Sequence, residues 1–275
     1  MRITITGDVA DFERRAKAFL RRDPLRYTVL ATIIANRTGG LDNSPDAYFL
    51  TAYDGDTLRG VVTRVGGREI YVSELPTDGF DPAVRALAEV VPGAGGVEGA
   101  DGIASRFAAR WSAVVGVPHR VSFVNVLYRL DALESPDVAG TPRRATESDR
   151  DVCVDWTRAM RVEAGIPDIG WDAVAMRRRI AAGRWWLWER DGEPVSLAAH
   201  QIPAYGVARV GPVYTPPAER GNGYASAVSA HVSHTLRTRG LAVCLFADKA
   251  NPTSNKIYRD IGFRPVGEFP HYVFD

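Results

Sequence analysis

The stretch Val210 to Ala230, which reads VGPVYTPPAERGNGYASAVSA, constrains the fold of this 275-residue chain more than any other. It begins as an apolar, β-branched run that indicates a strand, and it then passes two prolines. It turns through Arg220-Gly221-Asn222-Gly223 into a run of small residues that is typical of a helix. Glycines let a backbone approach a ligand, and the first N–H groups of a helix have no partner inside it. A strand, a glycine-rich loop and a helix in this order therefore predict a site for a phosphate group.

Composition and charge argue against several other classes of protein. The chain is 45% hydrophobic and 24% charged, as in a globular protein of one large or two ordinary domains. Its net charge is only +1, so we expect no nucleic-acid partner, which would require clustered positive charge. Short basic runs such as Arg177 to Arg179 are expected on solvated helix faces. Two distant cysteines, Cys153 and Cys244, and no apolar run near ~18 residues predict a cytoplasmic protein without a membrane partner.

The apolar periodicity predicts an α+β (mixed α/β) fold, with the order β-α-α-β-β-β-α-β-α-β in each half of the chain. In the first half we expect strands at 2–6, 47–54, 57–65, 69–73, 96–98 and 121–130, and helices at 8–22, 25–35, 82–91 and 101–115. In the second half we expect strands at 143–145, 184–190, 194–202, 207–214, 242–247 and 263–274 (the last as a strand or a hairpin), and helices at 147–163, 171–182, from the glycine loop to 238, and at 253–260. The repeated order predicts tandem domains at 1–133 and 143–275, joined by a linker at 134–142.

The two halves differ where the phosphate site is expected. After its third meander strand, the first half carries Glu74-Leu75-Pro76-Thr77-Asp78-Gly79-Phe80, with two acids, one glycine and no arginine. Acidic side chains repel a phosphate. We therefore expect that only the second half holds such a ligand.

Two motifs of the second half stand together as they do in a known family. The first, Arg220-Gly221-Asn222-Gly223-Tyr224-Ala225, fits the pattern Arg/Gln-x-x-Gly-x-Gly/Ala and follows Val-Tyr-Thr-Pro-Pro. The second, from Asn251 to Phe263, reads NPTSNKIYRDIGF. With these motifs the chain resembles the GCN5-related N-acetyltransferase (GNAT) superfamily. The resemblance covers about 207–263 by motif and 141–274 by element order. It implies two GNAT-like domains, each a central, mostly antiparallel twisted sheet flanked by helices, of which the first is degenerate.

The resemblance also implies a coenzyme A site in the second half. In that family the glycine loop and the following helix start bind the pyrophosphate. The preceding strand pairs its backbone with the pantetheine arm, where it separates from the next strand. The second motif supplies asparagines near the arm and a tyrosine that is proposed to protonate the leaving thiolate. The matching residues here are Arg220, Gly221, Asn222, Gly223, Tyr224 and Ala225 for the pyrophosphate, Val213, Tyr214 and Thr215 for the arm, Asn251 and Asn255 beside it, and Tyr258 as the acid. A phenol with a pKa of ~10 is close to a thiol at ~8.5, which suits this proton transfer.

The activity implied is direct transfer of an acyl group, the acetyl group of acetyl-CoA, to an amine without a metal. A neutral amine attacks the thioester, backbone N–H groups polarise its carbonyl, and a base or a water chain takes the amine proton. The candidate bases are Glu163, Asp155, Asp168 and His200, and each has a plain structural role as its alternative. His200 is preferred because an ordinary pKa of ~6.5 lets it act near neutrality. Ordered water alone would also serve.

Aromatic and histidine clusters outside the motifs have simpler interpretations. The run Trp185 to Trp188 lies on a predicted strand, so its rings alternate between faces and one or more is expected in the core. His231 and His234 stand one helical turn apart without a carboxylate at ligand spacing, so we expect them in solvent rather than on a metal. By the resemblance, the helices between 147 and 182 cover the acceptor pocket.

Three functions remain open at this point. The first is an N-acyltransferase whose partners are an acyl-CoA and an amine of a small molecule or peptide. The second is a non-catalytic sensor that binds acyl-CoA or a metabolite, and the third is a scaffold. Tyr258 favours the enzyme, because a sensor needs only the phosphate site. The sequence does not specify the acceptor, the acyl chain length, or whether the chain is a monomer or a homodimer.

Overall fold

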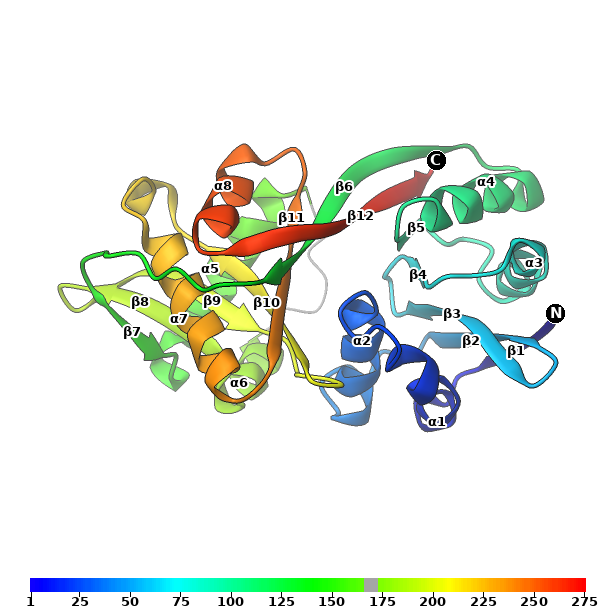
Figure 1. The fold of residues 1–275 in the computed structure, drawn as a ribbon, viewed down its shortest axis with the longest axis horizontal. Helices are drawn as coiled ribbons and strands as arrows, with labels where there is room; N and C mark the ends of the chain where they lie inside the picture. Colours follow the sequence, from blue (N-terminus) through cyan, green and yellow to red (C-terminus); the bar gives the residue numbers. More distant parts are fainter. Residues whose placement is uncertain (166–172) are drawn as a thin grey trace. The chain divides into compact units, whose positions relative to one another are not determined.

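The computed structural model describes residues 1–165 and 173–275, which form two compact units (Figure 1). The first unit comprises Met1–Leu127, Ala247–Asn251 and Val266–Asp275, and the second comprises Tyr128–Phe246 and Pro252–Pro265. Strands β6 (His119–Leu130) and β12 (Phe263–Phe274) contribute residues to both. Between residues 247 and 275 the chain therefore passes from the first unit to the second and back again. The domain boundaries expected at 133 and 143 remain a prediction.

The first unit contains a mixed sheet. Its strands are β1 (Arg2–Thr6), β2 (Ala47–Asp54), β3 (Thr57–Val65), β4 (Ile70–Val72) and β5 (Gly96–Gly99). Neighbours pair antiparallel from β1 to β4, β4 and β5 pair parallel, and β12 runs antiparallel to β5. β2 is buried on both faces because helices cover each of them.

Four α-helices cover this sheet: α1 (Val9–Leu20), α2 (Thr28–Thr38), α3 (Phe80–Val90) and α4 (Ile103–Val115). On one face, Phe12 of α1 stacks on Phe49 of β2 with ring centroids 4.8 Å apart. On the other face, α3 and α4 pack over Leu50 of β2. The helix expected at 25–35 begins later, at Thr28, because Asp23 holds the preceding residues in a turn. Its Oδ1 accepts from the Arg26 amide at 3.0 Å.

The second unit has the strand order β11-β10-β9-β8-β7. These strands are β7 (Thr141–Arg144), β8 (Trp185–Arg190), β9 (Glu193–His200), β10 (Val207–Tyr214) and β11 (Ala242–Asp248). Pairing is antiparallel from β7 to β10 and parallel between β10 and β11. The expected strand 207–214 is found with the same bounds, and the expected strand or hairpin at 263–274 is a single strand.

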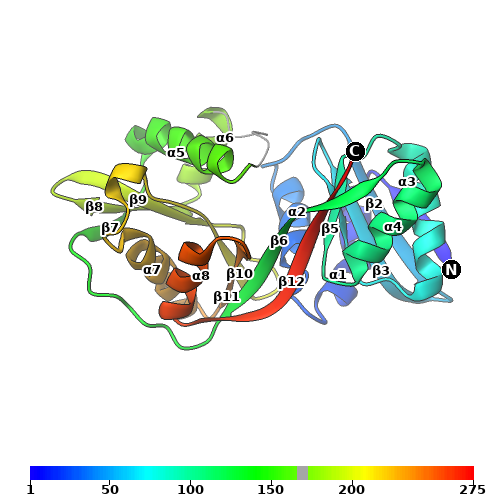
Figure 2. The same ribbon diagram turned by 90° about the horizontal axis from the view of Figure 1, so that it is seen from above.

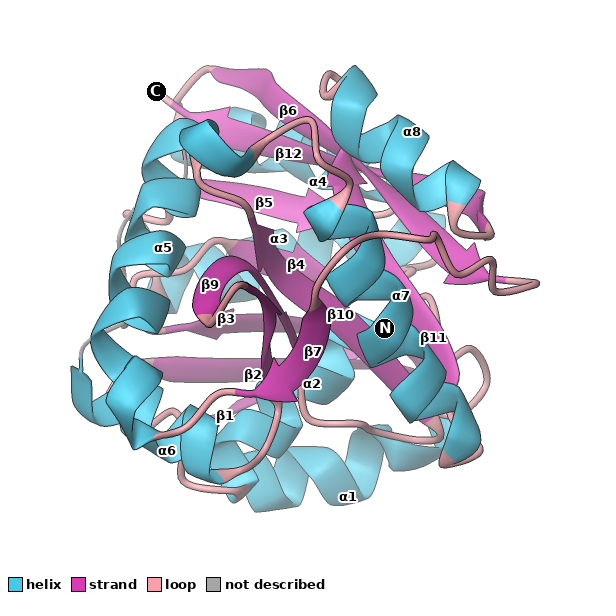
Figure 3. Ribbon diagram, turned by 90° about the vertical axis from the view of Figure 1, so that its left-hand side faces the viewer, coloured by secondary structure: helices cyan, strands magenta, loops and turns pink. Residues whose placement is uncertain are grey.

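Helices lie on both faces of this second sheet: α5 (Arg150–Glu163), α6 (Ala173–Ala181), α7 (Tyr224–Thr238) and α8 (Pro252–Asp260). Figures 2 and 3 show α5 and α6 on one face, with α7 and α8 on the other. Trp185 and Leu187 join the core under α5 and α6, whereas Trp186 faces the opposite way, towards α7. The tryptophan run therefore alternates between faces, and its expected contribution to the core is confirmed.

Two side chains that were expected in solvent are more buried than predicted. Arg179 is 9% exposed, because it falls on the face of α6 that Met176 and Ile180 bury. His231 of α7 is half-buried and packs edge-on against Trp186, with ring centroids 4.7 Å apart. Burial lowers the pKa of His231.

Cys153 and Cys244 are both buried thiols. Along 1–165 and 173–275, no helix combines the length and the apolar character that crossing a membrane requires.

Candidate functional site

Strands β10 and β11 separate before they end. Their parallel register runs from Val207 opposite Ala242 to Val210 opposite Leu245 and stops there. β10 continues for four residues, to Tyr214. On its other side, the register with β9 shifts between Val210 and Val213, which marks a β-bulge. The last part of β10 therefore carries backbone groups that its parallel neighbour does not pair.

Two side chains of the β9 region, neither of which the sequence singled out, hold this end of β10. Gln201 Nε2 donates to the Gly211 carbonyl at 3.0 Å, within the bulge. Ser196 Oγ donates to the Tyr214 carbonyl at 3.0 Å and shares a hydrogen bond with Thr215 Oγ1 at 2.8 Å. These side chains fix the strand from the β9 side and leave the side towards β11 free. Their polar character alone did not distinguish them from ordinary strand residues.

The glycine loop adopts the backbone conformation that its sequence predicts. Gly221 and Gly223 have φ angles of 85° and 80°, in the left-handed region that glycine enters without strain. Gly223 is the N-cap of α7, and among the described residues no side-chain hydrogen bond caps this helix. The amides of its first turn and the positive end of the helix dipole favour an anion. The loop and the start of α7 thus have the geometry of a phosphate site.

Arg220, at the start of the loop, is held by three contacts. Its Nε donates to the Thr215 carbonyl at 2.9 Å, and its guanidinium carbon lies 5.6 Å from the centre of the Tyr214 ring. Its Nη2 forms an ion pair with Glu163 Oε2 at 2.7 Å. Glu163 Oε1 accepts a hydrogen bond from the Tyr214 hydroxyl at 3.0 Å. Glu163, a candidate base from the sequence, is therefore the partner of two candidate coenzyme residues.

The other loop residues are exposed or turned into the unit. The Tyr224 side chain is buried, and its hydroxyl accepts from Arg190 Nη1 at 3.1 Å. Asn222 Nδ2 donates to the Glu219 carbonyl at 3.2 Å. Ala225 follows in the first turn of α7. At Tyr224 and Ala225, therefore, the groups free for an anion are backbone amides rather than side chains.

The second motif forms α8, and two of its three predicted site residues lie buried on this helix. Asn255 Oδ1 accepts from the Tyr128 hydroxyl at 2.7 Å. Tyr258 packs against Tyr128 and Phe263, with ring centroids 6.5 and 6.1 Å away. Its hydroxyl has no hydrogen bond to any described residue, and burial raises its pKa to about 12. Asn251 precedes α8, in a segment that belongs to the first unit.

His200 is level with the point at which β10 and β11 separate, because it pairs with Val210. Its side chain lies two residues from Ala198, on the face that α7 covers. The ring is buried, and its Nδ1 lies 2.9 Å from the Gln201 carbonyl. A carbonyl only accepts, so Nδ1 carries the proton and Nε2 keeps a lone pair. Burial, and secondarily nearby arginines such as Arg184, lowers the pKa of His200 against the raising effect of this hydrogen bond.

Of the two remaining candidate bases, only Asp155 lies among the described residues. The Asp155 side chain is 72% exposed and lies 3.9 Å from Arg158, as for a surface acid. Asp168 and Trp171 lie outside the described residues. Within the described chain, no three His, Cys, Asp or Glu side chains gather in a way that would hold a metal ion.

The first unit differs from the second at the corresponding elements. β4 and β5 stay paired from Ile70 opposite Val97 to Val72 opposite Gly99, the last residue of each strand. Gly79 has a φ angle of −86°, within the right-handed region. Glu74 places a carboxylate after β4, in an ion pair with Arg22 at 2.7 Å. This unit thus offers neither separated strands nor a left-handed glycine loop at that position.

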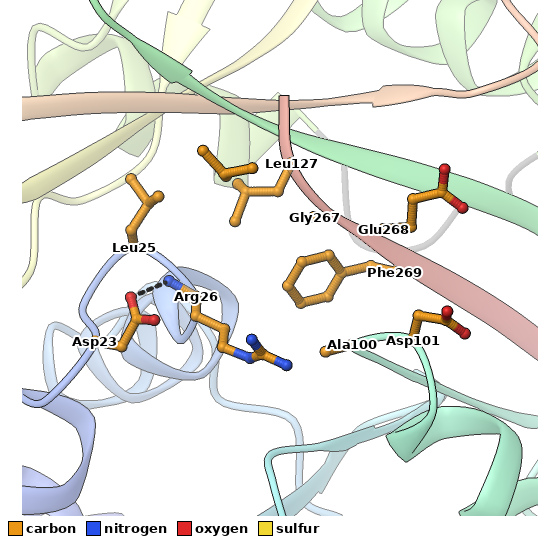
Figure 4. Close-up of a pocket in the computed structure, with 10 residues that line it drawn as sticks. Asp23, Leu25, Arg26, Ala100, Asp101, Leu127, Gly267, Glu268 and Phe269 are labelled. Atoms are coloured by element: carbon orange, nitrogen blue, oxygen red, sulfur yellow. Dashed lines mark hydrogen bonds between the residues drawn. The ribbon is translucent and has the colours of Figure 1, made fainter. Parts of the chain in front are cut away.

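A cavity of about 210 Å³ does lie in the first unit (Figure 4). Its buried walls are apolar, from Ala100, Leu127 and Phe269. The charged residues that line it, among them Arg26 and Asp101, are exposed at its rim. None of the described residues that line it has a side chain that is both buried and polar, so it lacks fixed side-chain contacts that select a ligand.

Comparison with known proteins identifies the fold. Residues 189–269 match the family model described as FR47-like protein, and this segment includes both motifs. The GNAT-family acetyltransferase from Colwellia psychrerythraea is 14% identical, with a TM-score of 0.65 and full coverage of both chains. A GCN5-related N-acetyltransferase from Sphaerobacter thermophilus is 16% identical, with a TM-score of 0.63 over 98% of this chain and 95% of the other. The chain has the GNAT fold.

The GNAT fold is present in tandem. The tandem GNAT protein from the clavulanic acid biosynthesis pathway is 10% identical, with a TM-score of 0.60 over 99% of this chain and 98% of that one. The resemblance read from the two motifs is thus confirmed at the level of the fold. No curated protein matched the chain in the corresponding sequence search.

Proposed function

We propose that the chain is an acyl-CoA-dependent N-acyltransferase that transfers an acetyl group directly from acetyl-CoA to an amine. The acceptor is an amine of a small molecule or a peptide. The second half, about residues 143–275, would carry the reaction, and the first half, about residues 1–133, would be a degenerate GNAT-like domain without a coenzyme loop.

The observation that carries this proposal is the separation of β10 from β11 beside an uncapped helix start. Val213 and Tyr214 have backbone groups that β11 does not pair, as pairing with an amide-bearing arm requires. The left-handed glycines Gly221 and Gly223 bring the amides of α7 to one end of that strand. One elongated ligand with a pyrophosphate and an amide-rich arm fits both features, and coenzyme A has this chemistry. Arg220, Asn222, Tyr224 and Ala225 would complete the pyrophosphate site, with Thr215 and the asparagines Asn251 and Asn255 beside the arm.

Tyr258 is the proposed acid for the leaving thiolate. Its phenol is buried and unpartnered among the described residues, whereas the neighbouring phenol of Tyr128 is committed to Asn255. Burial disfavours the charged thiolate as it disfavours the charged phenolate, so both pKa values rise together. The proton transfer between them stays nearly balanced for this reason.

His200 is the proposed acceptor of the amine proton, through ordered water. Its lowered pKa keeps the ring neutral at pH 7, and the tautomer set by Gln201 leaves Nε2 free to accept. The attacking amine must be neutral, and backbone N–H groups of β10 would stabilise the charge that develops on the thioester oxygen.

The test is binding of coenzyme A, followed by release of its thiol from acetyl-CoA in the presence of amine panels. We expect calorimetric binding of coenzyme A and thiol release that depends on a particular class of amine. Absence of coenzyme A binding to the folded, full-length chain would refute the proposal.

A further inference from the structure

Arg184, which directly precedes β8, is a buried guanidinium that no described residue pairs. Its side chain is only 9% exposed, and no described residue accepts a hydrogen bond from it or forms an ion pair with it. Burial lowers the pKa of Arg184, and no acid opposes this effect. A buried charge without a partner is unfavourable, so buried arginines are normally paired. An anionic ligand would supply the partner that the chain itself does not.

Two further guanidinium groups lie on the same face of the second sheet. The His200 amide donates to the Arg184 carbonyl at 3.0 Å, so these two residues stand opposite each other. Trp186, two residues after Arg184, faces α7 and pairs with Arg144 of β7. Arg239 is the C-cap of α7, the helix that covers this face. The charges of Arg184, Arg239 and Arg144 all lower the pKa of His200, which places the three guanidinium groups around that ring.

The positive charge on this face is only partly compensated by the protein. Arg144 lies over the Trp186 ring, with its guanidinium carbon 5.1 Å from the ring centre. Arg239 lies at the negative end of the α7 dipole. Neither forms an ion pair with a described residue, and the sequence from 220 to 247 contains no acid at all. Arg184 has neither a ring nor a helix end, so its charge remains the one that requires a ligand.

We propose that Arg184, Arg144 and Arg239 bind a phosphate group. A phosphate dianion accepts hydrogen bonds from several guanidinium groups at once, and its charge suits three arginines better than that of one carboxylate. The site lies at the end of α7, a helix of 15 residues or about 22 Å, so it is separate from the coenzyme loop at the helix start. Arg144 and Arg239 are exposed, which opens the site to solvent. Inorganic phosphate and a phosphorylated metabolite share the required chemistry.

A phosphate at this site acts on His200. Its negative charge offsets the three positive charges around the ring, so phosphate raises the pKa of His200 from its lowered value. If His200 accepts the amine proton, phosphate also moves the acid limb of the activity to higher pH. That last consequence rests on the proposed function, whereas phosphate binding and the change at His200 do not.

Calorimetry with sodium phosphate tests the site, at about pH 7.5 and at an ionic strength held constant with sodium chloride. Arg184→Met should weaken binding at least about tenfold, and Arg144→Gln or Arg239→Gln about fivefold each. The two exposed variants keep the test valid if Arg184→Met does not fold. Arg237→Gln is the matched control, because this exposed arginine near the end of α7 donates to the Asp131 carbonyl, and its affinity should stay within about twofold. A parallel titration with glycerol 3-phosphate identifies the source, since the tighter of the two ligands is the natural class.

NMR titration of the histidine rings provides a second measurement. Phosphate should raise the pKa of His200 by at least about half a pH unit relative to chloride, and Arg144→Gln should reduce the change. No phosphate binding, an equal loss in Arg237→Gln, full displacement by coenzyme A, or an unchanged His200 would each overturn the site. Coenzyme A binding, measured separately on the same samples, decides the proposed acyltransferase. Either proposal can therefore fail while the other stands.

Discussion

Tyr258 and Tyr128 lie close together in the second unit, yet among the described residues only the phenol of Tyr128 has a hydrogen-bond partner. The Tyr128 hydroxyl donates to Asn255 Oδ1 at 2.7 Å, while that of Tyr258 donates to no described residue. The Tyr258 hydroxyl is therefore available to a ligand, whereas that of Tyr128 is not. This difference assigns the proposed proton donor more sharply than the motif does, because both tyrosines are close to Asn255.

Replacing Tyr258 by phenylalanine keeps the ring packing and removes the proposed acid. We expect kcat to fall by about 10²-fold, because general acid catalysis contributes at least that much, with coenzyme A affinity unchanged. Tyr128→Phe is the control and should keep kcat within about threefold. Because the pKa of Tyr258 is raised to about 12, the unmodified enzyme should show no alkaline loss from this group below about pH 11. Full activity in Tyr258→Phe would remove it from the mechanism.

For His200 the prediction concerns the acid side of the pH profile. Its pKa is lowered by burial, so the proposed base becomes protonated, and activity falls, only at a pH below its ordinary value of about 6.5. His200→Gln should remove this acid limb and lower kcat by about 10²-fold. The profile of kcat/KM from pH 5 to 8 measures it. An unchanged limb in the variant would leave ordered water as the sole proton acceptor.

At the scale of elements, the loop before α7 depends on glycine for its conformation. Gly221 and Gly240 both have positive φ angles, 85° and 74°, and open space where a side chain would stand. Alanine at either position costs about 1 kcal/mol of unfolding free energy, from backbone strain alone. They differ in place, since Gly221 lies in the coenzyme loop and Gly240 follows the end of α7.

Comparing Gly221→Ala with Gly240→Ala therefore distinguishes a loss of stability from a loss of coenzyme A affinity. We expect Gly221→Ala to weaken coenzyme A binding about tenfold, because it shifts the amides that face the pyrophosphate. Gly240→Ala should show the same loss of stability and unchanged affinity. Denaturant unfolding and calorimetry measure the two quantities. Equal affinities in both variants would show that the loop amides do not contact the ligand.

The start of α5 depends on the carboxylate of Asp149. It accepts from the Thr146 amide at 2.7 Å and from Arg143 Nη1 at 2.7 Å. Hydrogen bonds from Arg143, and then from Thr146, lower the pKa of Asp149 to about 2, against the raising effect of burial. A lowered pKa means that the stabilisation is present above the ordinary value of about 4 and is lost as the pH falls towards 2.

Asp149→Asn should accordingly reduce the unfolding free energy by about 2 kcal/mol at pH 7, and the difference should shrink as the pH falls from about 4 to 2. Asp151→Asn removes an acid that is 77% exposed in the first turn of α5, and it should change the unfolding free energy by less than about 0.5 kcal/mol. Denaturant unfolding at several pH values checks both. A loss that is constant with pH would mean that the carboxylate is not ionised in the native state.

At this scale the sequence predicts well those features that depend on neighbouring residues, such as the bounds of a strand. β3 and β10 have the expected bounds because strong turn signals border their apolar runs, Asp54-Gly55-Asp56 before β3 and Pro216-Pro217 after β10. The separation of β10 from β11 is not local, since it depends on where a register between two strands stops. The family resemblance implied it, but no pattern in either strand encodes it.

Local sequence patterns also could not predict which distant side chains pair in the site. Glu163 and Arg220 stand 57 residues apart, and each was assigned a separate role from its own neighbourhood. Only the packing of α5 against β10 brings them into contact. His231 shows the same effect in another way, because the burial that its helix face receives depends on Trp186 across the sheet.

At the scale of the whole molecule, the chain returns to its first unit at the end. β12 was expected as the last strand of the second half, yet Val266–Asp275 belongs to the first unit. There Val273, Tyr272 and His271 pair with Gly96, Val97 and Glu98 of β5. The Phe274 ring also stacks on Trp111 of α4, with centroids 5.4 Å apart.

This arrangement predicts how a shortened chain behaves. A fragment of residues 134–275 keeps the proposed coenzyme site but loses β5 and α4, so the end of β12 exposes an unpaired strand edge and the Phe274 ring. Exposed edges and apolar rings promote aggregation. We expect the fragment to be insoluble, and co-expression of residues 1–133 to restore solubility, because it supplies β5 and the strand's natural partners. Gel filtration after expression measures both outcomes. A soluble monomeric fragment would show instead that the second half folds alone and that β12 needs no partner from the first unit.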